Sequence, residues 1–352
     1  MKRFDYIRAA SASEAIAASA HPNSVYLAGG TNMLDLMKIG VARPDRVIDI
    51  SRIEGLGEIT WQDDGGVRIG ALVRNADLAY DGRFAKTFPS VAEALLSGAS
   101  AQVRNAASVG GNLMQHTRCA YFHDPASACN RRVPGSGCDA REGENRLHAV
   151  LGWSEHCIAT HPSDFCVPLV AFDASVEVEG PHGSRDIKLW DFYSLPGSTP
   201  DQVTALQPGE LIVAVKIPAA SAAFAPNARY LKLRERTSFA FAVVSCAAAL
   251  QIDGGMIQSA RIALGGVAAK PWRSQGAEAA LVGVEPGREA FEKAASLALA
   301  DARPSGDNAF KIELARRIIV RALTLAMEGT PETMPALPAS PFPSESGARH
   351  VG

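Results

Sequence analysis

The chain has 352 residues, of which 47% are hydrophobic and 20% charged, and its formal net charge is -2. This length suits two or three domains with substantial cores, and the nearly neutral charge gives no reason to expect binding to nucleic acid or to an anionic membrane surface. No window approaches the about 20 consecutive apolar residues that span a bilayer, and Asp5 and Arg8 interrupt the N-terminal stretch, so we expect neither a membrane span nor a signal peptide.

The first 55 residues predict a small α/β unit, which we interpret as a first subdomain. An apolar strand at 25–28 leads through a Gly-Gly turn into a helix at 32–39, and a second apolar strand follows at 46–50.

Residues 56–225 predict a second and larger subdomain of mixed strands and helices. Short strands over 57–73 surround the hairpin signal Asp63-Asp64-Gly65-Gly66. Helices are expected at 75–80, 90–96 and 164–173, and strands at 174–179 and 210–217. The segment from about 116 to 160 has no sustained period and is rich in Arg, His, Cys, Gly and Pro. We interpret this segment as an insertion into the second subdomain.

The C-terminal part predicts a separate α+β domain over residues 226–330. Long strands at 229–235, 241–253 and 256–264 precede helices at 274–282, 288–300 and 311–326. Residues 331–352 are rich in Pro and Ser and predict a flexible tail. The expected fold class of the whole chain is therefore α+β.

Two glycine turns have the features of an anion site. Gly29-Gly30 follows a predicted strand and precedes a helix, and Gly110-Gly111 repeats this pattern later in the chain. Backbone N–H groups at such turns can converge on a phosphate, and two turns could hold one pyrophosphate from two sides. Neither a GxGxxG motif nor a P-loop lysine is present. An ordinary strand-to-helix turn explains each motif equally well when it is taken alone.

Four motifs taken together give a resemblance. AGGTNML, GALVRNADL, SVGGNLM and HPSD, in this order, resemble the flavoprotein subunits of the xanthine dehydrogenase and carbon monoxide dehydrogenase family. The resemblance implies an FAD-binding fold of the vanillyl-alcohol-oxidase (PCMH) type, with FAD between two α/β subdomains and an α+β C-terminal domain behind them. It implies FAD contacts at Tyr26, Leu27, Ala28, Gly29, Gly30, Thr31, Asn32, Met33, Leu34, Ser108, Gly110, Gly111, Asn112, Asp164, Ile212 and Lys232.

Two of these implied contacts have structural alternatives of equal weight. Ile212 lies in an apolar strand and could be an ordinary core residue, and Lys232 could be a solvated charge at a strand edge.

The cysteines concentrate in the insertion and just after it, where five of the six lie between positions 119 and 166. The spacing of Cys119, Cys129, Cys138 and Cys157 matches neither a paired-CxxC zinc ribbon nor a compact ferredoxin run. The arginines and glycines around them suit an anionic iron-sulfur cluster, whereas five nearby histidines leave a mixed Cys/His zinc site as a rival.

A second set of motifs concerns these cysteines. CAYFHD, CNRRVPGSGC, ENRLHAVLG and CIATHPSDF resemble the flavoprotein subunit of bacterial periplasmic aldehyde oxidoreductases. That resemblance implies a [4Fe-4S] cluster with the ligands Cys119, Cys129, Cys138 and Cys157. Cys166 and Cys246 are interpreted as buried thiols, and Cys166 is the alternative ligand.

The resemblance also implies partners. The chain would be the FAD-containing and [4Fe-4S]-containing subunit of a heterotrimer with a molybdopterin-binding large subunit and a [2Fe-2S] small subunit, and it would pass electrons to an external acceptor. Its compartment would be the cytoplasm, or the periplasm if a partner's signal exports the complex. A stand-alone flavin reductase and a zinc-stabilised interaction protein are the alternatives from other functional classes.

Overall fold

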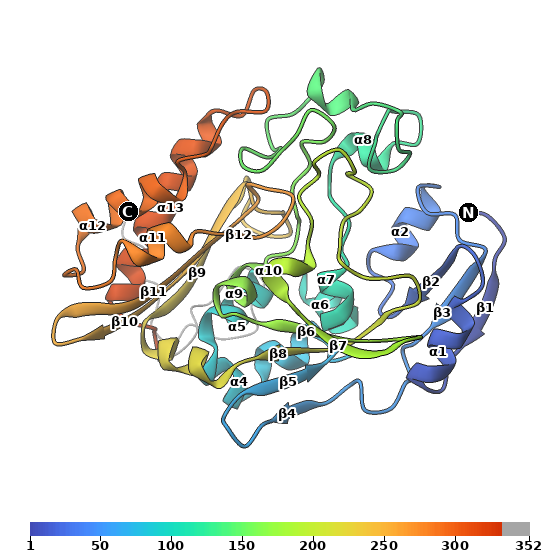
Figure 1. Cartoon of the computed structure of the whole chain (residues 1–352), viewed down its shortest axis with the longest axis horizontal. Coiled ribbons are helices and arrows are strands. Elements are labelled where there is room, and N and C mark those ends of the chain that lie inside the picture. The colour runs from blue at the N-terminus through green and yellow to red at the C-terminus, as the bar shows by residue number, and fades with distance from the viewer. Residues whose placement is uncertain (333–352) are drawn as a thin grey trace.

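Three β-sheets, one in each part of the chain, carry the helices of residues 1–332, which are the residues that the computed structural model describes (Figure 1). In Figure 1 the N-terminal sheet lies on the right, the C-terminal sheet and its helices lie on the left, and the middle sheet lies between them. This mixed content confirms that helices and strands both build the fold. All but the first two residues of the expected tail at 331–352 lie outside the described residues. No helix in residues 1–332 is long and apolar enough to cross a membrane.

The N-terminal sheet is parallel and has the strand order β1-β3-β2. Its strands are β1 (Asp5–Arg8), β2 (Ser24–Leu27) and β3 (Arg46–Asp49), and its helices are α1 (Ala12–Ser19) and α2 (Met33–Lys38). Neither β1 nor α1 is predicted by the pattern of the sequence. Three of the four residues of β1 are exposed, so β1 shows no apolar alternation, and α1 is short and rich in Ala and Ser.

The middle sheet is antiparallel and joins strands that are far apart in the sequence. Its order is β4-β5-β8-β6-β7. The strands are β4 (Ile59–Trp61), β5 (Val67–Gly70), β6 (Ser175–Gly180), β7 (Gly183–Lys188) and β8 (Leu211–Ile217). In the predicted hairpin between β4 and β5, Gly65 has φ 92°, a conformation that favours glycine. All residues of β8 except Lys216 are buried, which explains why its apolar run was readable from the sequence.

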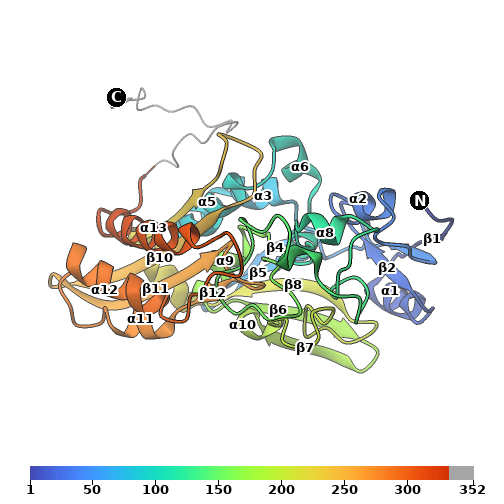
Figure 2. The same cartoon turned by 90° about the horizontal axis from the view of Figure 1, so that it is seen from above.

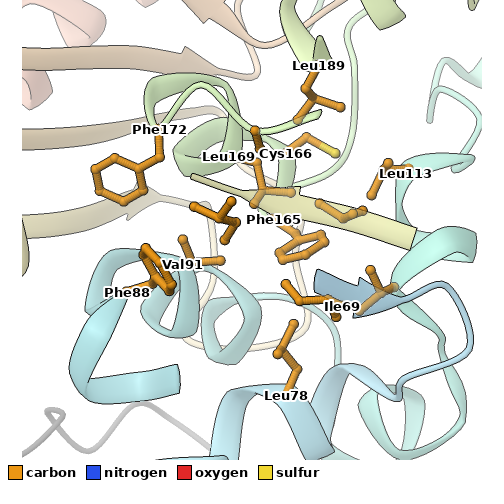
Figure 3. Close-up of a cluster of buried hydrophobic side chains, with 14 of the residues drawn as sticks. Ile69, Leu78, Phe88, Val91, Leu113, Phe165, Cys166, Leu169, Phe172 and Leu189 are labelled. Carbon is orange, nitrogen blue, oxygen red and sulfur yellow. The ribbon is translucent and has the colours of Figure 1, made fainter. Parts of the chain in front are cut away.

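Short helices cover the middle sheet and enclose its core. They are α3 (Asn75–Tyr80), α4 (Gly82–Thr87), α5 (Pro89–Ser97), α6 (Ala101–Ala106), α7 (Val109–Leu113), α9 (Cys166–Ala171) and α10 (Leu189–Phe192). Figure 3 shows Phe88 and Val91 facing Phe165 and Leu169 across this core, with Ile69 of β5 below Phe165. The helix predicted at 164–173 spans only Cys166–Ala171, and Asp164 precedes it and accepts a hydrogen bond from Tyr230 of β9 (Ala228–Leu233).

The C-terminal sheet is antiparallel with the order β12-β11-β10-β9. It consists of β9, β10 (Val244–Asp253), β11 (Met256–Gly265) and β12 (Trp272–Arg273), and its helices are α11 (Gln275–Ala279), α12 (Arg288–Ala298) and α13 (Phe310–Met327). A 3-10 segment, η2 (Ala219–Asn227), leads into β9. Helices α12 and α13 bury their apolar faces on one side of the sheet, and α5 and α9 pack on its strands from the middle part. The strand predicted at 241–253 begins at Val244, because residues 234–243 form a loop.

The insertion, residues 116–160, contains only the single turns α8 (Ala120–His123) and η1 (Asp139–Arg141). It forms the green arch at the top of Figure 1, and Figure 2 shows α8 close to α2. Phe122 and Cys129 form a small buried cluster with Leu36 of α2. At the other end, the N–H of Val150 donates a hydrogen bond to the carbonyl of Val267 over 2.8 Å. The insertion therefore bridges the first subdomain and the C-terminal domain.

Candidate cofactor cavity and cysteine pocket

A cavity of about 710 Å³ opens where the three parts of the chain meet. This volume lies within the range of clefts that hold small molecules and cofactors. We call it the cofactor cavity. The predicted FAD contacts that line it come from all three parts: Thr31, Asn32, Gly111, Asn112, Asp164 and Lys232.

The remaining predicted FAD contacts lie outside the lining of this cavity. Tyr26 points toward the middle part of the chain, where its hydroxyl donates to the carbonyl of Gly209 over 3.0 Å. Ile212 is buried in β8 as part of the middle core. The others form or flank the two glycine turns: Leu27, Ala28, Gly29, Gly30, Met33, Leu34, Ser108 and Gly110.

The two glycine turns lie against neighbouring backbone, and this contact requires glycine. A Cβ atom on Gly29 would stand 2.0 Å from the carbonyl oxygen of Ala106, and Gly30 has φ 72°. The N–H of Gly110 donates a hydrogen bond to the carbonyl of Ala71 over 2.8 Å, and a Cβ atom on Gly110 would collide with the Ala71 side chain. Because Ala106 ends the helix just before the second turn, this contact holds the two turns next to each other, and Thr31 and Gly111 line the cofactor cavity.

Unpaired polar atoms at the cavity show that it suits a polar ligand. Asn32 Nδ2 and Asn75 Oδ1 are buried and have no hydrogen-bond partner, although Asn32 Oδ1 accepts a bond from the N–H of His116 over 3.0 Å. Buried polar atoms in native proteins nearly always have partners, so these two atoms call for one. The residues present therefore fit a cofactor with ribose, phosphate or flavin polar groups.

A buried ion pair lines the cavity where the second subdomain meets β9. Lys232 Nζ lies 2.8 Å from an oxygen of Asp164, and the other carboxylate oxygen accepts the Tyr230 hydroxyl over 2.6 Å. The Lys232 side chain is only 3% exposed, although β9 is the edge strand. This burial excludes the alternative of a solvated edge charge. The pair therefore places one positive and one negative side chain in fixed positions at the cavity wall.

Several cavity residues were not predicted. Arg104 is buried and donates to the carbonyls of Leu96, Gly98 and Ala99, which shapes the turn after α5. The Arg118 guanidinium lies over the Phe241 ring at 4.6 Å from its centre, in the loop 234–243 at the cavity. Nothing in the sequence distinguishes these arginines from solvated ones, because their role depends on carbonyls and rings that only the fold brings near.

The four predicted metal ligands meet in one small pocket, which we call the cysteine pocket. Cys119, Cys129, Cys138 and Cys157 all line it, and all are free thiols. The backbones of Cys129 and Cys138 form an isolated antiparallel β-bridge. Within residues 1–332, no three His, Cys, Asp or Glu side chains are arranged to hold a single metal ion.

Burial and one positive charge dominate the electrostatics of the cysteine pocket. Burial raises the pKa of the Cys119 thiol to about 11, and it also raises the pKa of Cys138 and of Cys157. Arg131 lines the pocket beside these thiols with its Nε buried, and its guanidinium hydrogen-bonds Cys157. No carboxylate among residues 1–332 forms an ion pair with Arg131, and its Nε has no partner.

Cys119 belongs to both sites, since Thr117 and Cys119 line the cofactor cavity as well as the cysteine pocket. The imidazole of His148, which also lines the cofactor cavity, places Nε2 3.2 Å from Cys119 Sγ. Cys166 lies elsewhere. Its sulfur is buried in the middle core at 3.1 Å from the Tyr193 hydroxyl, and it does not line the cysteine pocket. The placement of Cys166 is that of a buried thiol rather than an alternative ligand.

Two family comparisons divide the chain at the boundary between the second and third sheets. Residues 2–220 match the family described as "FAD binding domain in molybdopterin dehydrogenase". Residues 229–326 match the family described as "CO dehydrogenase flavoprotein C-terminal domain". Together the two matches include every strand and helix described above, apart from one terminal residue each of β9 and α13, except η2, most of which lies between them.

Individual relatives and solved structures extend this similarity. The chain is 48% identical to the aldehyde oxidoreductase FAD-binding subunit PaoB of Escherichia coli (strain K12), over 93% of this chain and 99% of that protein. It is 29% identical to the carbon monoxide dehydrogenase medium chain of Hydrogenophaga pseudoflava, over 92% and 97%. A structure of carbon monoxide dehydrogenase from Hydrogenophaga pseudoflava gives a TM-score of 0.72 at 29% identity, over 93% of this chain and 98% of that chain. Reconstituted CO dehydrogenase from Oligotropha carboxidovorans gives 0.74 at 25% identity, over 93% and 99%.

Proposed function

The chain belongs to the molybdenum hydroxylase family as an FAD-binding subunit, and from this premise we propose that it transfers electrons in an aldehyde oxidoreductase-type complex and carries a [4Fe-4S] cluster beside its FAD. The chain is thus one subunit of an oxidoreductase. Under the proposal, a molybdopterin-binding large subunit oxidises the substrate, a small [2Fe-2S] subunit forwards the electrons, and an external acceptor receives them from this chain. The three subunits form a heterotrimer, or a dimer of heterotrimers.

The cofactor cavity supports the FAD part of the proposal. When bound, FAD supplies the redox chemistry, and the protein positions and tunes it. Asn32 and Asn75 would satisfy their unpaired atoms on the polar groups of the cofactor, and Thr31 and Gly111 of the two turns line the space that a pyrophosphate would enter. The Asp164–Lys232 pair would hold the flavin ring's polar edge, since both side chains line the cavity and are fixed by their ion pair.

One observation carries the cluster part of the proposal, namely that all four predicted ligands line one pocket around the unpaired charge of Arg131. A buried cation without a carboxylate partner is unfavourable unless an anion compensates it. A [4Fe-4S] cluster held by four thiolates supplies one-electron chemistry and a negative charge at this place. The residues of the pocket therefore fit the group, with Arg131 as its counter-charge.

The compartment belongs to the same proposal. The resemblance is to periplasmic aldehyde oxidoreductases. We propose that the chain reaches the periplasm together with a partner that carries the export signal, or acts in the cytoplasm. Fractionation of cells with and without that partner's signal sequence tests this point.

Cofactor analysis of the purified complex tests the function. We expect a flavin absorption band with about one FAD per copy of this chain, and a broad iron-sulfur shoulder beyond the contribution of the small subunit. Complexes with Cys157→Ala should contain about four fewer irons and four fewer acid-labile sulfides. Zinc bound in place of iron, or iron content unchanged by the substitution, would contradict the cluster part. Absence of FAD would contradict the function as a whole.

A further inference from the structure

His148 lies between the cofactor cavity and the cysteine pocket. Its imidazole lines the cavity, and its Nε2 is 3.2 Å from the sulfur of Cys119, the predicted ligand that lines both spaces. We propose that His148 is a positioning residue that donates a hydrogen bond to the Cys119 thiolate and thereby sets the reduction potential of the [4Fe-4S] cluster. This inference rests on the proposed function, since it concerns a cluster on these cysteines.

The direction of the hydrogen bond follows from the chemistry of a bound thiolate. A cysteine sulfur that ligates iron has no proton, so it can only accept, and the imidazole nitrogen that faces it must carry the hydrogen. A donor that points at a ligand sulfur withdraws electron density and stabilises the more negative, reduced cluster. Hydrogen bonds to the sulfurs are one of the main determinants of iron-sulfur potentials. Loss of the His148 donor therefore lowers the potential.

The position of His148 is fixed by contacts from the C-terminal domain. Lys311, fully buried at the start of α13, donates from Nζ to the carbonyl of His148 over 2.8 Å and to those of Leu147 and Gly266 over 2.9 and 2.7 Å. Asn308 Nδ2 donates to the carbonyls of His148 and Ala149, each over 3.2 Å. The backbone of the histidine is thus held by two side chains of another domain. Such support from outside the ligand set is typical of groups that tune a metal site.

The other histidines near the pocket do not share this arrangement. His123 directs its Nε2 to the carbonyl of Thr117 at 2.9 Å, and the ring of His116 stacks on Phe122 with 5.5 Å between the ring centres. Among the histidines in residues 1–332, only His148 places an imidazole nitrogen within hydrogen-bond distance of a cysteine sulfur. This difference makes His123 a suitable control, because it lies in the same insertion and binds backbone instead of sulfur.

The experiment is a redox titration of the purified complex, followed by the electron paramagnetic resonance signal of the cluster and by flavin absorbance. The variants are His148→Phe, which removes the donor, His148→Gln, which offers an amide donor, and His123→Phe as the control. We expect His148→Phe to shift the midpoint potential of the cluster downward, with a smaller change at the flavin. His148→Gln should recover part of the shift, and His123→Phe should leave the potential unchanged.

Each outcome separates this inference from the function on which it rests. Wild-type complex without iron on this chain would overturn the proposed cluster, and the role of His148 with it. Full iron content with an unchanged cluster potential in His148→Phe would overturn the role of His148 alone. Equal shifts of cluster and flavin, or an equal shift in His123→Phe, would also overturn it, because they indicate a general disturbance of the insertion.

Discussion

The cofactor cavity and the cysteine pocket are neighbours that share Cys119, yet they are built in opposite ways. The cavity collects side chains from all three parts of the chain, so that Asn32 reaches it from the turn before α2 and Lys232 from β9. All the residues of the cysteine pocket come from the insertion, within 117–159. A site made from the whole fold depends on domain packing, whereas a site made from one segment depends on how that segment is anchored.

The largest expected effect tests whether the two sites are independent. Cys157→Ala should abolish or nearly abolish the binding of about four irons by this chain, while FAD stays near one per chain, because Cys157 lines only the smaller pocket. Iron, labile sulfide and flavin contents of the purified complex measure both sites at once. Cys246→Ala is the matched control, since Cys246 is buried in β10 and far from the pocket lining. Loss of FAD together with iron would show that the two sites are not independent.

The next effect concerns the buried pair at the cavity. Lys232→Met leaves the Asp164 carboxylate buried without its partner, which costs about 3–5 kcal/mol. We expect FAD affinity to fall by about tenfold or more, while the iron of the cysteine pocket remains. Flavin release followed by fluorescence measures the affinity.

The double variant Asp164→Asn with Lys232→Met provides the control for this pair. It removes both charges, so it should regain much of the lost stability without regaining FAD affinity. Full recovery of FAD affinity in the double variant would show that the pair supports the wall and does not contact the cofactor.

A smaller effect tests the close backbone contact behind the first glycine turn. Gly29→Ala places a methyl group against the carbonyl of Ala106, so we expect a loss of about 1–3 kcal/mol in the free energy of unfolding. Gly82→Ala, in α4 where a Cβ meets nothing, should be neutral or stabilise by up to about 1 kcal/mol. Denaturant unfolding of both variants gives the difference. Equal effects at the two positions would show that the first turn tolerates a side chain.

The smallest effect provides a baseline, because it acts on the middle sheet and on neither site. The hydrogen bonds of Arg68 to Glu177 lower the pKa of that carboxyl to about 2. Since the folded pKa lies below the ordinary 4.5, the stabilisation is complete above pH 4.5 and is lost as the pH falls toward 2. Glu177→Gln should therefore cost about 1 kcal/mol at pH 7, discounted for partial exposure, and should flatten the acid dependence of unfolding between pH 4.5 and 2.

The cofactor contents of Glu177→Gln at pH 7 should equal those of the wild type. A lower FAD or iron content would mean that the middle sheet and the sites are coupled more closely than the structure indicates.

The sequence predicted those elements whose pattern is local and apolar. Helix α3 was predicted at its observed bounds, and β8 to within one residue, because buried runs with clear ends carry their own signal. The strand β1 was missed because its residues are mostly exposed, and the loop 234–243 was read partly as strand because Phe241 and Val243 continue an apolar run.

The site residues divide in the same way into those with a local signal in the sequence and those without one. Clustering made the four cysteines visible in the sequence, and the structure places them in one pocket, although neither spacing nor geometry by itself identifies the metal group. Asp164 and Lys232 were named only through the resemblance. Asn75 and Arg104 gave no signal, because a buried amide or guanidinium becomes a site residue only when distant segments close around it.

The three carbonyls that surround Lys311 have a consequence for protein engineering. Two of them belong to the end of the insertion and the third to Gly266 after β11, so the insertion does not behave as a self-contained module. A graft of residues 116–160 into another scaffold would leave Leu147 and His148 without this anchor unless Lys311 and Asn308 were transplanted with it. Deleting the insertion would in turn leave a buried ammonium with a single acceptor. The transferable unit is therefore a loop and a helix terminus that lie about 160 residues apart in the sequence.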